Sequence, residues 1–421
     1  MNVVDVAAWP GLPAPQYVGG NRLVLHRGGD ALFPAMCRAI AEAEREVWLA
    51  TYIFHDDAAG RMVADALLRA ASRGAAVHLL VDGFGAKATL PTLRRWFAGA
   101  AVRLEVFRPL DRWWSWLQPG QLRRLHQKLC TVDEKVAFVG GINVIDDRYD
   151  LSHGWTDTPR LDFAVEVTGP LALSVQIAAR AIWERAHLGR GWRDEIRALA
   201  RSPAPVERTV RLLRRLRSRT SGGDGEATLA PMRAAFVVRD NFRQRRAIER
   251  SYVQAIRSAR RRVDIAVPYF YPGRAFRRAL RQAARRGVAV RLLLQGKIDY
   301  RIAAMAARVL YDELRAYGVR IYEYTPAFLH AKVAVVDDDW ATVGSSNIDP
   351  LSLLLNLEAN IVVDDVDFTR TLAAALDEAI TASLEVQGEA MRRGWRGLMQ
   401  RGLIAWCASV YLRMAGITGR Y

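Results

Sequence analysis

Lysine is nearly absent from this chain of 421 residues, although the chain is strongly basic. Only five lysines occur among 61 basic residues, and the formal net charge is +17. Because arginine is used almost everywhere else, the positions that keep a compact ammonium group carry information. A charge imbalance of this size indicates a polyanionic partner, either nucleic acid or an anionic membrane surface, and it does not choose between them.

Cysteine is also scarce. Cys37, Cys130 and Cys407 are widely spaced, match no zinc pattern and cannot form an even disulfide framework, which favours a reducing compartment. The first 15 residues lack a basic start and a long apolar core, so we expect no signal peptide there.

Long apolar runs are missing as well. No stretch reaches the roughly 18 residues that a spanning helix needs, so we do not expect one. The best membrane candidate is Leu403–Leu412, which is too short to cross a bilayer. Its pattern fits an interfacial segment, with Trp406 at headgroup depth, as well as a buried core helix.

The chain repeats itself. Val47–Phe54 (VWLATYIF) corresponds to Val263–Phe270 (VDIAVPYF), and Arg73–Gly83 (RGAAVHLLVDG) corresponds to Arg286–Gly296 (RGVAVRLLLQG). Further matching segments follow in the same order, and each apolar strand pattern alternates with a helical one. The sequence therefore predicts two tandem α/β domains, related by internal duplication, with helices on both faces of each sheet.

The repeat also predicts domain bounds. An Arg-rich stretch with a flexible Ser221–Gly225 run separates the copies and indicates a linker. We expect an N-terminal extension (1–21), a first domain (22–187), a basic linker (188–231), a second domain (232–385) and a C-terminal amphipathic tail (386–421). The first copy carries 13 extra residues before its motif, including Trp113, Trp114 and Trp116, and a loop at that place is a candidate for substrate contact.

One polar motif occurs once in each copy with the same spacing. The two sets are His126, Lys128, Asp133, Gly140, Gly141 and Asn143, and His330, Lys332, Asp337, Gly344, Ser345 and Asn347. Two matched copies inside a repeat are hard to attribute to chance, whereas a single His-x-Lys pair would not be.

The spacing predicts a local geometry. Leu125–Val132 is expected to be a strand, which would place His126 and Lys128 on one face. Asp133 begins a polar turn and is expected to brace it, as Asp337 does in the second copy. The glycines would let the backbone bend and approach a ligand closely, and Asn143 would return beside the histidine.

These groups suit phosphodiester chemistry. An imidazole can attack phosphorus or move a proton near neutral pH. Lysine and asparagine can hold the oxygens that gain charge in the transition state.

The paired motif resembles that of the phospholipase D superfamily, over about Arg22 to Leu384. Within it, the chain is similar to the bacterial cardiolipin synthases of the B type. The supporting stretches are FVGGIN, LDFAVEVTGP from Leu161 and WATVGSSNIDPLSLLLNLEAN from Trp340. The resemblance implies two phospholipase D-like α/β/α sandwich domains and a two-step transfer without metal or cofactor.

The resemblance also implies roles for individual residues. His126 would be the nucleophile that becomes a phosphohistidine, and His330 the general acid and base. An acidic residue would orient each histidine, at the matching positions Asp162 and Glu358. Lys128, Asp133, Lys332 and Asp337 belong to the catalytic motif with the two histidines, and Asn143, Ser345 and Asn347 are the expected substrate contacts. Gly141 stands where the second copy has Ser345, so the half-sites are not equivalent.

The implied reaction converts two phosphatidylglycerol molecules into cardiolipin and glycerol. The alternatives are another lipid hydrolase or headgroup transferase, a nuclease with the same catalytic groups, or a scaffold with inactive motifs. Tryptophans interleaved with arginines favour a membrane interface over nucleic acid, although aromatic rings also stack on bases. We expect a peripheral protein on the cytoplasmic side of the inner membrane, with no nucleic-acid partner, docked through Trp113, Trp114, Trp116 and Trp406. Acceptor specificity and oligomeric state stay open.

Overall fold

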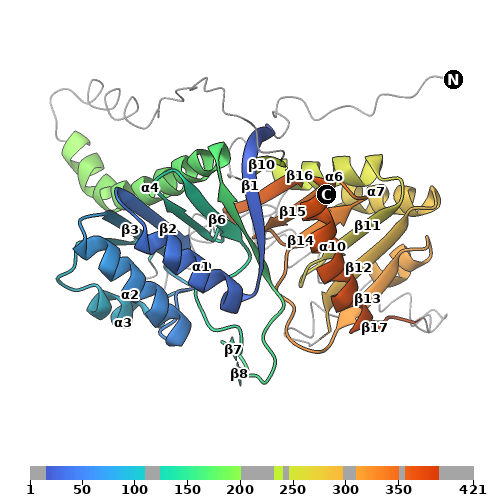
Figure 1. Cartoon of the computed structure of the whole chain (residues 1–421), viewed down its shortest axis with the longest axis horizontal. Coiled ribbons are helices and arrows are strands. Elements are labelled where there is room, and N and C mark those ends of the chain that lie inside the picture. Colours follow the sequence, from blue (N-terminus) through green and yellow to red (C-terminus); the bar gives the residue numbers. More distant parts are fainter. Residues whose placement is uncertain are drawn as a thin grey trace.

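The computed structural model describes residues 16–109, 124–200, 232–239, 246–296, 310–349 and 356–387. It contains two α/β halves that lie next to each other (Figure 1). The first half consists of β1 (Val18–Arg27), α1 (Gly29–Ala41), β2 (Glu46–Thr51), α2 (Ala58–Ser72), β3 (Ala76–Asp82), α3 (Leu90–Trp96), β4 (Val102–Phe107), β5 (Leu129–Val132), β6 (Val136–Gly140), β7 (Tyr149–Asp150), β8 (Gly154–Trp155), β9 (Phe163–Thr168) and α4 (Pro170–Ala200).

The second half repeats this order. It consists of β10 (Met232–Arg239), α6 (Ala247–Ser258), β11 (Arg262–Ala266), α7 (Arg274–Arg285), β12 (Ala289–Gln295), β13 (Arg320–Tyr324), β14 (Val333–Val336), β15 (Trp340–Gly344), β16 (Glu358–Asp364), α10 (Val366–Thr381) and β17 (Leu384–Glu385).

The strand order makes the duplication explicit. The first half runs β4-β3-β2-β5-β6-β9-β1, and the second half runs β13-β12-β11-β14-β15-β16-β10, with β17 added at its far edge. Strands β2, β3 and β4 are mutually parallel, as are β11, β12 and β13, and the other neighbouring strands pair antiparallel. A short antiparallel contact of β1 with β10, at Val18↔Ala234 and Asn21↔Met232, joins the two sheets. The predicted fold class is confirmed.

Each helix forms for local reasons that the sequence carries. In α7 the buried residues Phe276, Ala279, Leu280 and Ala283 recur at helical spacing, so one apolar stripe faces the sheet and arginines occupy the rest. The Asp57 side chain accepts a hydrogen bond from the Gly60 amide and caps the N-terminus of α2. The strands between the helices are buried on both faces, as expected for a layered α/β domain.

The hydrophobic core binds the halves into one unit. One cluster lies under α1 and α2, another under α6 and α7, and a third is built from both halves together with α4 and α10. The shared cluster includes Leu125, Leu161, Leu329 and Leu357, each of which is next to a predicted catalytic or histidine-orienting residue. The core therefore fixes the place where the two motifs meet.

Two expected bounds differ from the observed elements. Strand β1 begins at Val18, before the predicted domain start at residue 22. Helix α4 continues to Ala200, past the predicted end at residue 187, because its helical pattern runs on into the basic stretch. The N-terminal extension up to residue 15, most of the linker (201–231) and the tail from residue 388 lie outside the described residues. Their assignments stay predictions.

Candidate active site

The two halves exchange backbone hydrogen bonds beside both histidines. The His126 amide donates to the Leu357 carbonyl (3.0 Å), and the Leu357 amide donates to the Arg124 carbonyl (2.9 Å). In the mirror arrangement, the His330 amide donates to the Leu161 carbonyl (2.9 Å). Isolated parallel bridges, Leu125↔Leu357 and Leu161↔Leu329, mark the same crossings. Each histidine segment is therefore held against the other half of the chain.

Each imidazole is hydrogen-bonded to a carboxylate from the opposite half. His126 Nδ1 lies 2.9 Å from Glu358 Oε2, and His330 Nδ1 lies 2.6 Å from Asp162 Oδ2. Both carboxylates are fully buried. Because a carboxylate accepts, Nδ1 carries the proton and Nε2 keeps its lone pair for attack on phosphorus or for proton transfer. The pairing crosses the duplication in both directions.

Two lysines supply positive charge beside the histidines. Lys128 Nζ donates to the His126 carbonyl (2.7 Å), and Lys332 Nζ donates to the His330 carbonyl. Burial lowers the pKa of Lys128 to about 7 and that of Lys332 to about 8, against the opposing effect of Glu358 and Asp162. Each ammonium uses one of its three donors in this way, so donors remain for an anionic ligand, whose charge would stabilise the protonated form.

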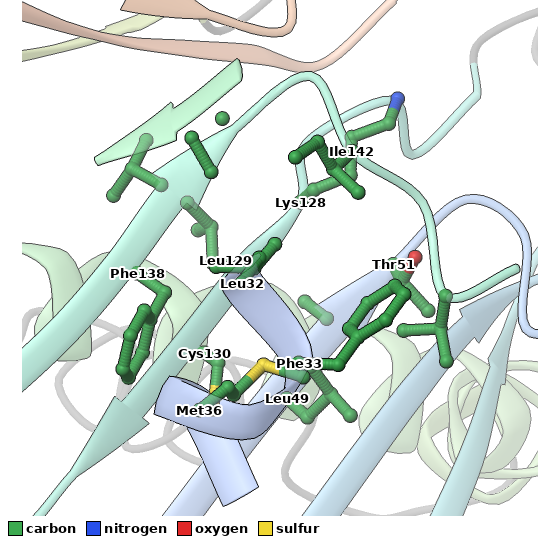
Figure 2. A pocket seen from close by; sticks show the side chains of 15 residues that line it. Leu32, Phe33, Met36, Leu49, Thr51, Lys128, Leu129, Cys130, Phe138 and Ile142 are labelled. Carbon is green, nitrogen blue, oxygen red and sulfur yellow. The ribbon is translucent and has the colours of Figure 1, made fainter. Parts of the chain in front are cut away.

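A small apolar cavity lies beside Lys128. Lys128 is at the rim of a cavity of about 20 Å³ between α1, β2, β5 and β6. Figure 2 shows apolar side chains around this cavity, including Leu32, Phe33 and Phe138, with the Lys128 nitrogen turned away from them. The cavity holds little more than a single water molecule and is part of the core, so it is not the lipid site.

The histidine pKa values are lowered in both half-sites. Burial lowers the pKa of His126, while Glu358 opposes this effect. Burial lowers the pKa of His330 well below its ordinary value, and Lys332 and Arg160 lower it further. Both imidazoles are therefore neutral at neutral pH.

The two carboxylates differ. Burial raises the pKa of Asp162 to about 6, with Lys332 opposing. Burial also acts to raise the pKa of Glu358, but His126, Lys128 and Ser345 outweigh it and the pKa is lowered overall. Ser345 Oγ donates to Glu358 Oε2 over 2.6 Å, and the Ser345 carbonyl accepts from His126 Nδ1 over 3.1 Å. Glu358 is therefore more readily ionised than Asp162.

The Gly141 and Ser345 difference has a steric cause. A Cβ at Gly141 would lie 2.3 Å from Asp162 Oδ1, so only glycine leaves room for that carboxylate. Gly140 lies equally close to β9, with its Cβ position 2.5 Å from Ala164 Cα. The close approach observed at these glycines is to Asp162 and to β9, and their expected approach to a ligand stays a prediction.

The strand expected over Leu125–Val132 is shorter than predicted. Strand β5 begins at Leu129, so His126 and Lys128 precede it. The reason is the crossing at Leu125↔Leu357, which diverts residues 124–126 to the other half. The two side chains are brought together by this crossing and by the lysine-to-carbonyl hydrogen bond, and strand alternation is not the cause.

Asp133 and Asp337 act away from the histidines. Asp133 accepts hydrogen bonds from the amides of Glu44, Arg45 and Glu46 at 2.8–2.9 Å, at the start of β2. Asp337 binds the amides at the start of β11 in the same way. Both have a positive φ, 53° and 52°, which fits the tight turn that the sequence placed there. Their side chains therefore hold the connections that lead into β2 and β11, and a direct part of either residue in catalysis stays a prediction.

The expected substrate contacts are buried near the motif. The Asn143 side-chain oxygen accepts a hydrogen bond from the Ile53 amide over 3.2 Å. This oxygen therefore fixes the segment that follows β2 next to the motif. Ser345 is occupied with Glu358, as described. The Asn347 Oδ1 atom is buried and has no hydrogen-bond partner within the described structure. Contact of the three residues with substrate stays a prediction.

The structure adds residues that sequence reasoning missed. Asp82 Oδ2 accepts from the Leu125 amide, and Gln295 Oε1 accepts from the Leu329 amide, both over 2.9 Å. Each therefore positions the residue before a histidine. The sequence did carry a signal for them. Asp82 and Gln295 are the polar residues just before the final glycine of the matching repeat segments Arg73–Gly83 and Arg286–Gly296. Tyr52, whose ring lies edge-on to His126 with centroids 5.2 Å apart, had no comparable signal.

The predicted docking tryptophans Trp113, Trp114, Trp116 and Trp406 lie outside the described residues. In the described part of the chain, no helix is long and apolar enough to cross a bilayer. No three side chains of His, Cys, Asp and Glu in that same part come together in a group that could hold a metal ion.

Comparison with known proteins identifies the family. A family model described as "Cardiolipin synthase, PLD-like domain" matches residues 36–153 and 252–380, one match in each half. The chain belongs to the cardiolipin synthase family of the phospholipase D superfamily. It is an enzyme of that family, as the resemblance implied.

Individual relatives cover almost the whole chain. Cardiolipin synthase B of Salmonella typhimurium is 37% identical over 90% of this chain and 86% of its own length, and the Escherichia coli K12 protein of the same name is 36% identical over the same shares. Cardiolipin synthase A of Pseudomonas putida is 30% identical over 94% of this chain and 76% of its own length. The crystal structure of a phosphatidylserine synthase from Haemophilus influenzae has the same fold, with a TM-score of 0.64, 12% identity and coverage of 94% and 95%.

Proposed function

We propose that this enzyme transfers a phosphatidyl group from one phosphatidylglycerol molecule to another, which gives cardiolipin and free glycerol. The observation that carries the proposal is the crossed pair of histidines, each bound through Nδ1 to a buried carboxylate of the opposite half. Two imidazoles prepared in this way provide one nucleophile and one proton carrier, which a two-step transfer needs. The names of the B-type relatives support the lipid substrate.

In the first step, His126 Nε2 attacks phosphorus and the bond from phosphorus to the glycerol oxygen breaks. The departing glycerol oxygen takes a proton from His330, and the phosphatidyl group stays on His126. In the second step, His330 takes the proton of the incoming glycerol hydroxyl as its oxygen attacks phosphorus. The phosphorus–nitrogen bond then breaks and cardiolipin leaves. Lys128 and Lys332 hold the non-bridging oxygens as charge builds on them.

The unequal half-sites support this assignment of roles. His126 Nδ1 has two acceptors, the Glu358 carboxylate and the Ser345 carbonyl, which make its Nε2 the more electron-rich nucleophile. The surroundings of His330 lower its pKa, so its protonated form is a strong acid for the leaving alcohol. The negative charge of a bound phosphodiester favours that protonated form before the first step.

The test is to incubate the purified protein with phosphatidylglycerol vesicles and to analyse the lipids and glycerol released. Cardiolipin and glycerol in equal amounts are expected, and phosphatidic acid alone would instead identify a hydrolase. His126→Ala and His330→Ala are each expected to abolish transfer while the protein stays folded. Substantial turnover by either folded variant contradicts the two-histidine mechanism. A labelled phosphoryl group trapped on His330 instead of His126 reverses the roles.

The proposed partner is an anionic phospholipid membrane, which the net charge of +17 favours electrostatically. We propose peripheral attachment on the cytoplasmic side of the inner membrane. The tryptophan-bearing insertion before His126 is one proposed contact, since interfacial tryptophans prefer the headgroup region.

A further inference from the structure

The β7–β8 hairpin, which shortly precedes Asp162 in the chain, exposes two large apolar side chains. Trp155 is 65% exposed and Leu151 is 56% exposed. Of the described residues, only Leu384 is another large apolar residue that is more than half exposed. The remaining exposed ones are only 40–46% exposed: Met62, Leu173, Ile177 and Val366 lie on helices, and Phe84 follows β3. Among the described residues, the hairpin is thus the place where two large apolar side chains that are each more than half exposed occur within five residues of each other.

The hairpin has a defined structure, held by its own strand pairing, hydrogen bonds and ring contacts. It forms its own two-stranded sheet, with Tyr149↔Trp155 and Asp150↔Gly154 paired, and it projects away from both halves near their junction (Figure 1). Asp150 Oδ1 accepts from the amides of Ser152 and His153 and so closes the tip. The Trp155 ring lies edge-on to Tyr149, with centroids 5.4 Å apart. Tyr149 lies in turn against His55, at 4.7 Å.

The root of the hairpin is fixed to the catalytic residues. The Arg160 guanidinium, which follows the hairpin, donates to the carbonyls of Asp146 and Tyr149, at the start of the hairpin. Arg160 is followed by Leu161 and by Asp162, the partner of His330. The segment is also held to the second half, because Thr158 Oγ1 donates to the Pro326 carbonyl over 2.9 Å. The tip is therefore held at a fixed place relative to the histidines.

We propose that Leu151 and Trp155 insert into the boundary between headgroups and acyl chains of an anionic bilayer and hold the active site at the membrane surface. This inference rests on the proposed function. The phosphodiester of a lipid must reach His126 and His330 while the acyl chains of that lipid stay in the bilayer, so the active site must be held close to the membrane surface. Tryptophan and leucine on a projecting loop suit that boundary, where an apolar ring with one polar group is favoured. The positive net charge of the whole chain attracts the protein to an anionic surface, and the two apolar side chains of the hairpin supply the contact that inserts.

The test compares the double variant Leu151→Ala/Trp155→Ala with the matched control Met62→Ala/Ile177→Ala, which removes two exposed apolar side chains from α2 and α4. Co-sedimentation with phosphatidylglycerol vesicles is expected to weaken about tenfold or more in the hairpin variant and to stay unchanged in the control. Turnover of vesicle lipid should fall with binding. Turnover of dihexanoyl phosphatidylglycerol, kept below its micelle concentration, should stay at the parent level.

Parent-like vesicle binding by the hairpin variant overturns the proposal. So does a loss of self-association in sedimentation velocity that explains the weaker binding, because the occupant would then be a second copy of the chain. The single variant Trp155→Tyr, which keeps an interfacial ring, should retain vesicle binding even if the double variant is poorly folded, and its failure to do so also overturns the proposal. If the parent makes no cardiolipin, the proposed function fails, and the binding measurements still decide the role of the hairpin.

Discussion

His126 Nδ1 lies 2.9 Å from Oε2 of Glu358, a residue 232 positions away in the other half of the chain. Glu358→Gln keeps the shape but replaces the acceptor that holds the imidazole proton on Nδ1. We expect kcat to fall by about 10²- to 10⁴-fold, as when other catalytic histidines lose their orienting carboxylate. The measurement is initial-rate kinetics on phosphatidylglycerol, with the thermal unfolding midpoint as a check of folding. Glu42→Gln, an exposed glutamate on the first half, should be unaffected.

The lowered pKa of Lys128, about 7, predicts the alkaline limb of the pH profile. Only the protonated lysine can hold the phosphodiester, so kcat/KM should decline as the pH rises through about 7. In Lys128→Arg the charge persists at every accessible pH. The limb should then move up towards about 8, where Lys332 loses its proton. An unchanged limb in this variant would show that another group sets it.

The acid side of the same profile follows from His126. As a nucleophile it must be neutral, and burial lowers its pKa below the ordinary value of 6.5. The rate should therefore persist below pH 6.5 and decline only at lower pH, where the imidazole becomes protonated. A decline that begins well above pH 6.5 contradicts this environment.

The Asp133 carboxylate is predicted to stabilise the fold without touching substrate. Asp133→Asn weakens three charge-assisted hydrogen bonds to the start of β2, so we expect a loss of about 1–3 kcal/mol of unfolding free energy at pH 7. The backbone hydrogen bonds outweigh burial and lower the pKa of Asp133, so this stabilisation is present above about pH 4 and is lost as the pH falls through the lowered pKa. Urea unfolding at pH 7 and pH 3 measures both effects. The neighbouring Glu134→Gln is the control, and an equal effect there would point to general surface charge.

Activity is predicted to survive chelation, because Lys128 and Lys332 provide the charge that a divalent ion would otherwise supply. Turnover should be the same before and after dialysis against EDTA. Loss of turnover that a divalent cation restores would show that the lysines are not sufficient.

The insertion before His126 is predicted to contribute to membrane binding. The variant with Trp113, Trp114 and Trp116 replaced by alanine should bind anionic vesicles more weakly at every salt concentration, because salt does not screen the apolar contact. The parent should favour anionic over neutral lipid and weaken with salt. If the triple variant binds and turns over vesicles like the parent, the insertion is a surface loop.

The sequence predicted the fold and the motif from local signals. Apolar strands alternate with amphipathic helices, and the matched spacing of His126 and His330 identified two half-sites. It could not predict which carboxylate serves which histidine, because Asp162 and Glu358 each act across the junction and no local pattern records that contact. For the same reason, the strand expected from Leu125 begins only at Leu129: pairing with Leu357 replaces local strand pairing. The roles of Asp82 and Gln295 depend on a loop that returns to their strand ends.

The crossed pairing also has a consequence for how such a chain arose. A protein with only one copy of the repeat would carry a histidine and an acidic residue that cannot meet within the same copy. Its site could be completed only in a symmetric homodimer, in which each subunit lends its carboxylate to the other. Gene fusion would have made that pairing permanent and would have allowed the sequences of the two copies to diverge. The two half-sites do differ: one pairs Glu358 with Ser345, and the other pairs Asp162 with Gly141. A symmetric dimer would have to use the same pair in both half-sites.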